Sequence, residues 1–239
     1  MEKAPFCEEM CYFYFKRKGA IVVEILVIIE EAQLERSSII YSKLDTKKTL
    51  VQFSPEFSLA EGTLGELYQK EGISGIRRLF YENFHWQPDG YVRVKLNELI
   101  TVVGNIMPEG VEMAEETLLL SDLPMKMSYH LSENDDFAVF HFQRAVLKAL
   151  AKTIGKKQNL FKVPHYLSLL SKICETNLNN SQFFSLLKGY ASLQDVQSTK
   201  LIIPVPETYE IQKDESGLSV KMTDSERNIQ ILENLIKDS

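Results

Sequence analysis

The sequence predicts one α/β domain over residues 20–239, preceded by an N-terminal extension over residues 1–19. Strand patterns stand near both ends of the chain and helical patterns lie between them, as is typical of an α/β domain whose two ends meet in one sheet. The chain carries no internal repeat and no long linker rich in Pro, Gly or Ser, and its 239 residues can bury a sizeable core. These observations favour one domain over two tandem domains.

The first strands and the first helix follow from changes in the apolar period. Residues 20–29 are a run rich in Val and Ile, which predicts a strand buried on both faces. Residues 38–54 predict a β-hairpin with its turn at residues 45–48. After Pro55 the apolar residues recur at helical spacing, and Gly72 is expected to end this first helix.

A second group of elements follows Gly72. Ser74 is expected to cap another helix, and the segment QPDGYVRV predicts a turn followed by a short strand. The next helix starts near Leu96 and ends near Gly104. The segment 106–136, rich in Met, Glu and Asp, is predicted to be irregular.

The second half of the chain is predicted to be helical until it returns to strand near its end. An amphipathic stripe follows residue 142. Further helices are expected to start at Pro164 and at Asn180 or Ser181. The segments KLIIPVP and GLSVKM are expected to be strands. The last helix is expected to open with a capping box over residues 223–226. Its inward-facing residues are expected to be Ile229, Leu232 and Ile236.

Composition excludes several classes of function. The chain has 33 acidic and 27 basic residues, a net charge of −6, and no dense Lys/Arg cluster, so nucleic acid is not an expected partner. The cysteines Cys7, Cys11 and Cys174 make neither a disulfide framework nor a zinc pattern, although Cys7 and Cys11 are close enough in sequence to pair. No targeting or spanning segment is recognised, which, taken literally, predicts a cytoplasmic protein.

Common catalytic signatures are missing from the sequence. It contains no phosphate-binding loop and no GxGxxG, GxSxG or HExxH motif, and its four histidines are scattered. The acidic segment SENDDF, residues 132–137, offers carboxylates to a divalent cation but equally suits a solvated loop. Trp86 beside Phe84 and His85 suits either a ligand pocket or the core.

Five segments, taken in order and at their spacing, resemble the LytR-CpsA-Psr family, also described as cell envelope-related transcriptional attenuators. They are ERSSIIYSKLDTKKTLVQFSPEF, LYQKEGISGIRRLFYENF, PDGYVRVKLNELITVVGNI, DDFAVFHFQRAVLKAL and TNLNNSQFFSLLKGY, and the resemblance spans about residues 22–236. It implies an α/β/α sandwich with a central mixed sheet flanked by helices, an apolar tunnel for a polyprenyl chain, and a place outside the membrane of a Gram-positive bacterium. It also implies transfer of a glycopolymer from polyprenyl pyrophosphate to peptidoglycan, aided by magnesium.

The residues at the family's charged motifs differ in this chain. Holding a pyrophosphate requires arginines, and neutralising the leaving group requires a carboxylate that binds the metal. Where the family usually has Arg-Ser-Asp-Thr, this chain retains Arg36 but has Ser38 at the carboxylate position. Where it usually has Pro-Arg-Asp, the chain has Pro55, Glu56 and Phe57, which replaces a cation with an anion and an anion with a phenyl ring.

A third charged motif is altered in the same way. The two arginines that usually precede a glutamine are matched by Val139 and Phe142, while the glutamine itself is retained as Gln143. Leu131 falls where another arginine is common, and Asp136 falls near an acidic position of the family. The remnant site therefore consists of Arg36, Ser38, Glu56, Phe57, Asp136 and Gln143, although Arg36 equally suits a surface ion pair.

The apolar residues of the resembled tunnel are retained. An isoprenoid pocket is predicted from these residues, which equally suit an ordinary filled core: Phe80, Phe84, Leu99, Val103, Phe140, Leu147, Leu170, Phe184 and Leu187.

The altered motifs predict a LytR-CpsA-Psr-like pseudoenzyme that binds a polyprenyl lipid, a lipid-linked glycopolymer or a regulatory envelope protein, and that needs no cofactor. One alternative is a divergent glycopolymer phosphotransferase, which would need magnesium and would recruit Asp135, Asp136 and Glu56 to the metal and Arg36 to a phosphate. The other is a protein–protein interaction module. The family resemblance places the protein on the extracytoplasmic face of the membrane.

Overall fold

The computed structural model describes residues 23–31, 37–44, 48–59, 61–106, 108–113, 117–123, 143, 145, 146, 149, 168, 169, 171–179, 182, 198–214 and 217–237. Arg36, Asp136, the cysteines Cys7 and Cys11, and the segment SENDDF lie outside these residues. None of the helices in the described ranges combines the length and apolarity needed to cross a membrane.

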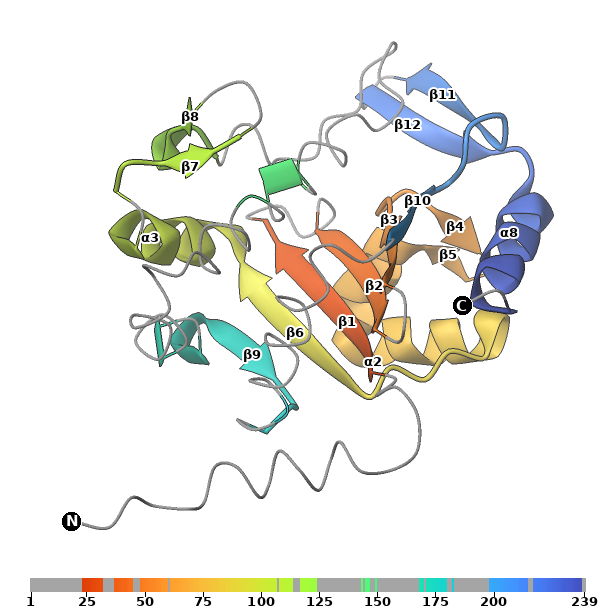
Figure 1. Ribbon diagram of the computed structural model, residues 1–239. Helices are drawn as coiled ribbons and strands as arrows, with labels where there is room; N and C mark the ends of the chain where they lie inside the picture. The colour runs from red at the N-terminus through yellow and green to blue at the C-terminus, as the bar shows by residue number, and fades with distance from the viewer. Residues whose placement is uncertain are drawn as a thin grey trace.

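A six-stranded mixed sheet forms the centre of the molecule, as expected (Figure 1). Its order is β10-β3-β2-β1-β6-β9. Pairing makes β1, β3, β6 and β10 parallel to one another, while β2 and β9 run the opposite way. The bounds are β1 Val23–Glu30, β2 Ser38–Leu44, β3 Lys48–Phe53, β6 Gly90–Lys95, β9 Cys174–Thr176 and β10 Ser198–Ile203.

The predicted hairpin is formed by β2 and β3, which pair from Ile39 opposite Phe53 to Leu44 opposite Lys48. Lys48 therefore belongs to the strand and not to the turn. The expectation that the two strands near the end of the chain would both join the central sheet is only half met. β10 joins the central sheet, but GLSVKM forms β12 (Gly217–Met222), which pairs with β11 (Tyr209–Asp214) in a separate two-stranded sheet (Figure 1). A partner strand immediately upstream allows this local pairing.

The segment after residue 106 is more regular than predicted. It contains β7 (Val111–Glu112) and β8 (Thr117–Leu118), which pair with each other, and the 3-10 helix η2 (Leu120–Asp122). Val111 and Leu118 are both buried, which gives this short hairpin a reason to fold back on the domain.

Helices cover both faces of the sheet. Alternation along β1 points Leu26 and Ile28 to one face and Ile29 to the other. The first face packs against α2 (Leu64–Phe84) and α8 (Ser225–Lys237), and we name its buried residues the α2 cluster. The second face packs with residues of α3 (Leu96–Ile106) and with the β7–β8 hairpin, and we name it the α3 cluster. The α/β/α sandwich is therefore confirmed.

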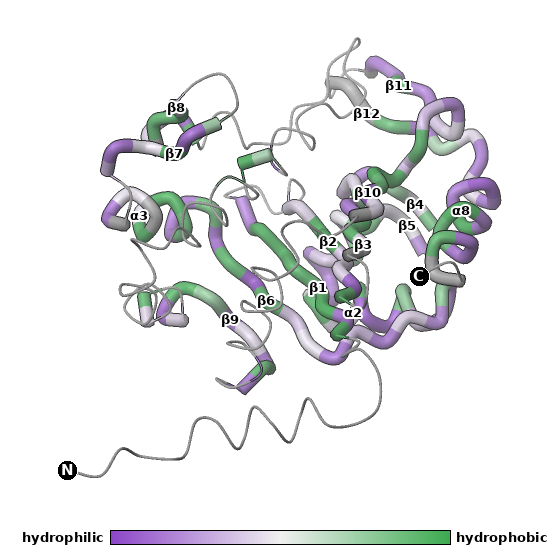
Figure 2. The backbone as a smooth tube through the Cα atoms, viewed as in Figure 1, coloured by the Kyte–Doolittle hydropathy of each residue, from purple (hydrophilic) through white to green (hydrophobic). Residues whose placement is uncertain are grey.

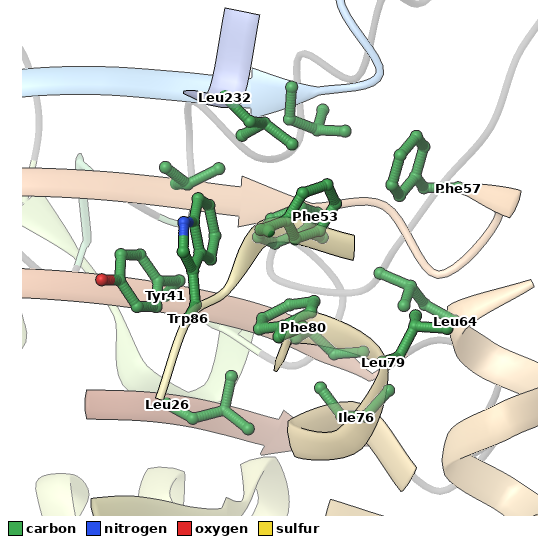
Figure 3. Close-up of a cluster of buried hydrophobic side chains, with 14 of the residues drawn as sticks. Leu26, Tyr41, Phe53, Phe57, Leu64, Ile76, Leu79, Phe80, Trp86 and Leu232 are labelled. Atoms are coloured by element: carbon green, nitrogen blue, oxygen red, sulfur yellow. The ribbon is translucent and has the colours of Figure 1, made fainter. Parts of the chain in front are cut away.

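The α2 cluster is rich in aromatic rings (Figure 3). Trp86 stacks on Tyr41 with ring centroids 4.2 Å apart, and Phe53 lies 4.9 Å from Phe80. Trp86 is 3% exposed, so it belongs to the core rather than to an open pocket. Figure 2 shows β1 as mainly hydrophobic, in contrast to β11.

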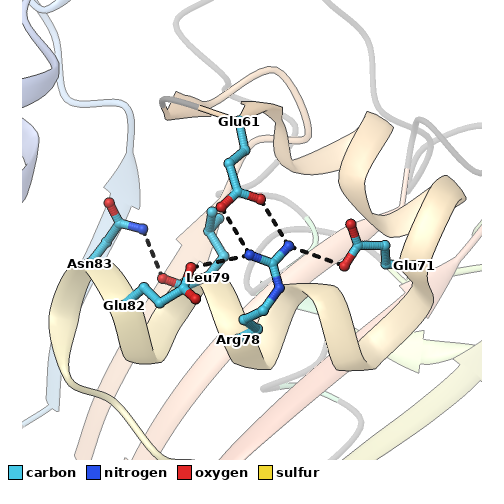
Figure 4. A network of polar contacts seen from close by, with 6 residues as sticks. All are labelled: Glu61, Glu71, Arg78, Leu79, Glu82 and Asn83. Atoms are coloured by element: carbon cyan, nitrogen blue, oxygen red, sulfur yellow. Dashed lines mark hydrogen bonds and ion pairs between the residues drawn. The ribbon is translucent and has the colours of Figure 1, made fainter.

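The expected break at Gly72 occurs inside α2, which is one helix kinked at this residue. Gly72 has φ 64° and ψ −150°, a conformation essentially restricted to glycine. Thr63 and Glu66 form a capping box at the start of α2, whereas the Ser74 hydroxyl donates to the Glu71 carbonyl and is not an N-cap. Arg78 contacts Glu61 at 2.8 Å, Glu71 at 3.0 Å and Glu82 at 3.1 Å, and thereby links the preceding turn to both halves of the kinked helix (Figure 4).

Replacing Gly72 with alanine is expected to lower the free energy of unfolding by about 1–3 kcal/mol, because of backbone strain alone. A Cβ at this position would meet nothing within 4 Å, so no steric clash contributes. Urea denaturation followed by circular dichroism measures the change. Glu82→Ala, an exposed substitution in the second half of α2, is the control and is expected to have a smaller effect. Equal stability of Gly72→Ala and the wild type would contradict the assigned kink.

Candidate functional site

The candidate site lies at the carboxyl edge of the parallel strands, where α/β proteins commonly bind ligands. β1 ends here at Glu30 and β3 ends at Phe53, while β2 begins here at Ser38 because it runs the opposite way. The segments around Ser38 and Pro55 match two charged motifs of the resembled family. They are therefore neighbours at one edge of the sheet.

Ser38, Gln52 and Gln143 form a buried hydrogen-bonded group, which we name the amide cluster. The Ser38 hydroxyl donates to the Gln143 Oε1 atom at 2.9 Å, and the Gln52 Nε2 atom donates to the same oxygen at 2.7 Å. The three residues are at most 3% exposed. The structure thus brings together two predicted site residues, Ser38 and Gln143, although they are 105 positions apart in sequence.

Gln52 was not predicted as a site residue. It lies in the run TLVQF, where strand alternation places it on the same face as Leu50 and Ile40, so a polar side chain there is unusual. The sequence signal that could have identified Gln52 as a site residue was a glutamine on the buried face of a predicted strand. Two polar atoms of this region, Gln52 Oε1 and the Ser37 hydroxyl oxygen, are buried and have no hydrogen-bond partner in the structure.

The turn after β3 packs into the core. Phe57 is fully buried in the α2 cluster, with its ring centroid 6.0 Å from that of Phe53. The Glu56 backbone N–H donates to the Ser54 hydroxyl at 3.1 Å, and the Phe57 N–H donates to the Ser54 carbonyl at 3.0 Å. Glu56 itself is half-buried. Phe57 is therefore a packing residue that holds the turn against α2.

The same turn satisfies the first amides of α2. The Leu64 N–H donates to the Phe57 carbonyl and the Gly65 N–H to the Pro55 carbonyl, both at 2.9 Å. The Glu66 N–H donates to the Thr63 hydroxyl at 3.2 Å. Helix N-termini bind phosphates through backbone N–H groups that have no other partner. These N–H groups of α2 already have partners, so the start of α2 does not offer a phosphate site.

The predicted lipid-pocket residues are divided between the two faces of the sheet. Phe80 and Phe84 belong to the α2 cluster, whereas Leu99 packs against the α3 cluster. These three side chains therefore do not line a common cavity. The side chains of the other members are outside the described residues: Val103, Phe140, Leu147, Leu170, Phe184 and Leu187.

Cys174 starts β9 and is partly buried, instead of lying in a helix as its apolar surroundings suggested. Burial raises the pKa of its thiol to about 11, so it is protonated at neutral pH and is not an activated nucleophile. His85 ends α2 in the left-handed conformation, with φ 56°. Its place is that of a helix C-cap.

Comparison with known proteins identifies the class of fold and a family that the chain resembles. The model of the LytR_cpsA_psr family matches residues 125–237, a little less than half of the chain. The LytR-CpsA-Psr resemblance drawn from the sequence is therefore confirmed. No curated protein matches the chain.

Solved structures share the fold over nearly the whole chain. Lin1025 from Listeria innocua superposes with a TM-score of 0.65 at 15% identity, over 91% of this chain and 98% of its own. TagV from B. subtilis gives 0.67 at 14% identity, over 93% and 97%. A structure of TagT bound to LI-WTA gives 0.65 at 13% identity, over 92% and 90%.

The residues of the amide cluster do not fit the magnesium ion that the family implies. Mg²⁺ prefers carboxylate and water oxygens in an octahedral arrangement. The cluster offers one hydroxyl and two neutral amides, and the Gln143 carbonyl oxygen already accepts two hydrogen bonds. Within the described part of the chain, no three His, Cys, Asp or Glu side chains are grouped as metal ligands.

Replacing Gln143 with leucine is expected to lower the free energy of unfolding by about 2–3 kcal/mol, because two buried donors, on Ser38 and Gln52, lose their common acceptor. Thermal and urea denaturation measure the loss. Ala145→Gln is the control, because Ala145 is exposed on the same helical segment and its replacement should be nearly neutral. A Gln143→Leu variant as stable as the control would show that the amide cluster does not hold this segment in place.

Proposed function

We propose that this chain is a LytR-CpsA-Psr-type cell-envelope protein that binds a lipid-linked glycopolymer without transferring it. The amide cluster carries the proposal. It occupies the edge of the sheet where the resembled family places charged residues, and it is neutral and internally hydrogen-bonded. The family match and the shared fold, which includes TagT bound to LI-WTA, support the choice of ligand.

The expected loss of transfer has a physical reason. Displacing a pyrophosphate builds negative charge on the leaving group, and enzymes offset that charge with metal ions and charged donors. Each charged hydrogen bond contributes about 1.5–3 kcal/mol. The Ser38 hydroxyl and the Gln52 amide donate to Gln143 and carry no charge, and Phe57 is enclosed by the core, so these positions contribute no charged hydrogen bond. The ligand would then be held by its saccharide or lipid part.

Binding and transfer must be measured separately on one preparation. The purified chain is mixed with a polyprenyl-pyrophosphate-linked saccharide in detergent, and binding is followed by fluorescence anisotropy of a labelled saccharide. Transfer is followed by adding peptidoglycan and magnesium and measuring labelled product by mass spectrometry. Saturable binding without transfer is the expected outcome.

Two outcomes would overturn the proposal. Turnover that is abolished in Arg36→Ala but unchanged in the exposed-site control Lys200→Gln would identify the chain as the divergent phosphotransferase. Absence of both binding and turnover, together with stable co-elution with an envelope protein, would identify the interaction module instead.

A further inference from the structure

A pocket of about 230 Å³ lies at the edge of the sheet where β1 and β6 end and β9 begins. Its charged lining residues come in equal numbers of each sign: the carboxylates of Glu30, Glu98 and Glu175, and the cations of Arg93, Lys95 and Lys172. None of these residues belongs to the amide cluster. The pocket is therefore a separate polar site whose total formal charge is zero.

The group of side chains around Arg93 carries an excess of negative charge. The Glu30 side chain is 8% exposed, and its Oε1 atom accepts a hydrogen bond from the Tyr68 hydroxyl at 2.5 Å. Arg93 lies between two carboxylates, 3.7 Å from Glu30 and 2.7 Å from Glu175. Burial lowers the pKa of Arg93, but the neighbouring Glu30, Tyr68 and Glu175 outweigh it and raise that pKa, so the guanidinium stays charged. Two carboxylates around one cation leave a net charge of about −1.

The remaining charged side chains of the pocket carry an excess of positive charge. Lys95 and Glu98 are 3.7 Å apart and both are well exposed, so they neutralise each other loosely. Lys172 is exposed and forms no ion pair with any described residue. Its ammonium group is therefore available to an anion that enters from solvent.

We propose that this pocket binds a small zwitterion, with its ammonium group against Glu30 and Glu175 and its phosphate or carboxylate against Lys172. A simple anion would meet the carboxylates of Glu30 and Glu175, and a simple cation would leave Lys172 uncompensated. The volume corresponds to about eight water molecules at liquid density, which suits a compact amino-phosphate or amino acid.

The test is an NMR titration of the ¹⁵N-labelled chain at low ionic strength, where screening of exposed charges is weak. The probes are O-phosphoethanolamine and β-alanine, which are zwitterions, and inorganic phosphate and ethanolamine, which carry the separate charges. Lys172→Gln removes the cation that forms no described ion pair, and Glu175→Gln removes one of the two carboxylates beside Arg93. Lys200→Gln, an exposed substitution on β10 at the other end of the strand order, is the matched control.

At least one zwitterion is expected to shift resonances of Arg93, Lys95 or Lys172 saturably, with an affinity about fivefold or more above that of phosphate or ethanolamine. If O-phosphoethanolamine alone binds, the anionic end must be a phosphate; if β-alanine binds equally, a carboxylate suffices. Lys172→Gln should weaken zwitterion binding about fivefold, and Glu175→Gln should weaken ethanolamine without weakening phosphate. Phosphate binding that equals zwitterion binding and is insensitive to Glu175→Gln would overturn the proposal in favour of a simple anion site. Absence of saturable shifts at these residues with every probe would overturn it altogether.

Discussion

Replacing Phe57 with aspartate is expected to destabilise the protein by more than about 4 kcal/mol, which leaves little folded domain. The phenyl ring is fully buried in the α2 cluster and contacts the ring of Phe53. The variant loses this packing and also places a carboxylate among apolar side chains. The same turn supplies the carbonyl groups that satisfy the first amides of α2, so displacement of Phe57 also disturbs the start of that helix.

The measurement is urea denaturation by circular dichroism, with Phe57→Leu as the control. Leucine keeps an apolar side chain in the cluster and should cost clearly less. The double variant Glu56→Arg with Phe57→Asp restores the residue types of the resembled Pro-Arg-Asp motif but should neither fold well nor transfer glycopolymer. A stable, active double variant would refute both the packing role of Phe57 and the proposal of a broadly altered site.

Replacing Asn228 with leucine is expected to destabilise the protein by about 2–4 kcal/mol, because several buried polar groups lose their partners at once. The Asn228 Oδ1 atom accepts from the Val205 N–H at 2.9 Å, and its Nδ2 atom donates to the Thr208 hydroxyl at 2.8 Å and to the Asp224 carbonyl at 3.0 Å. Asn228 and Thr208 are both fully buried. These bonds join α8 to the segment that leaves β10.

Gln230→Leu on the same helix is the control for Asn228→Leu, because Gln230 is exposed and its replacement should change stability by less than about 0.5 kcal/mol. Both variants are compared by thermal and urea denaturation. If the two leucine variants are equally stable, the hydrogen bonds of Asn228 do not contribute to the docking of α8.

Sequence patterns located correctly those elements that are determined by residues close together in the sequence. The β2–β3 hairpin follows from two apolar arms around a polar turn, and the break at Gly72 follows from the one residue type that tolerates its conformation. The start of α8 was predicted one residue early, because the expected capping box began at Thr223, whereas the Asp224 side chain accepts from the Arg227 N–H at 2.8 Å. A capping interaction spans only three or four positions, so the sequence contains all of it.

The candidate site was only partly accessible to such reasoning. Ser38 and Gln143 were selected through the family resemblance, and their contact is a property of the folded chain. Gln52 joins them only because β3 pairs with β2 in the register that places Gln52 opposite Ile40. Reading Phe57 as a remnant site position gave no indication that its ring belongs to the core.

By itself the sequence determined the α/β class, the LytR-CpsA-Psr resemblance and the break at Gly72, because these depend on local periodicity and on residue type. Only the tertiary structure decided which side chains share a site. It placed Phe80 and Leu99 on opposite faces of the sheet and gathered Glu30, Arg93 and Lys172 around one pocket. The reason is that strand order, register and facing are set by contacts between distant segments, and no pattern within a short window contains them.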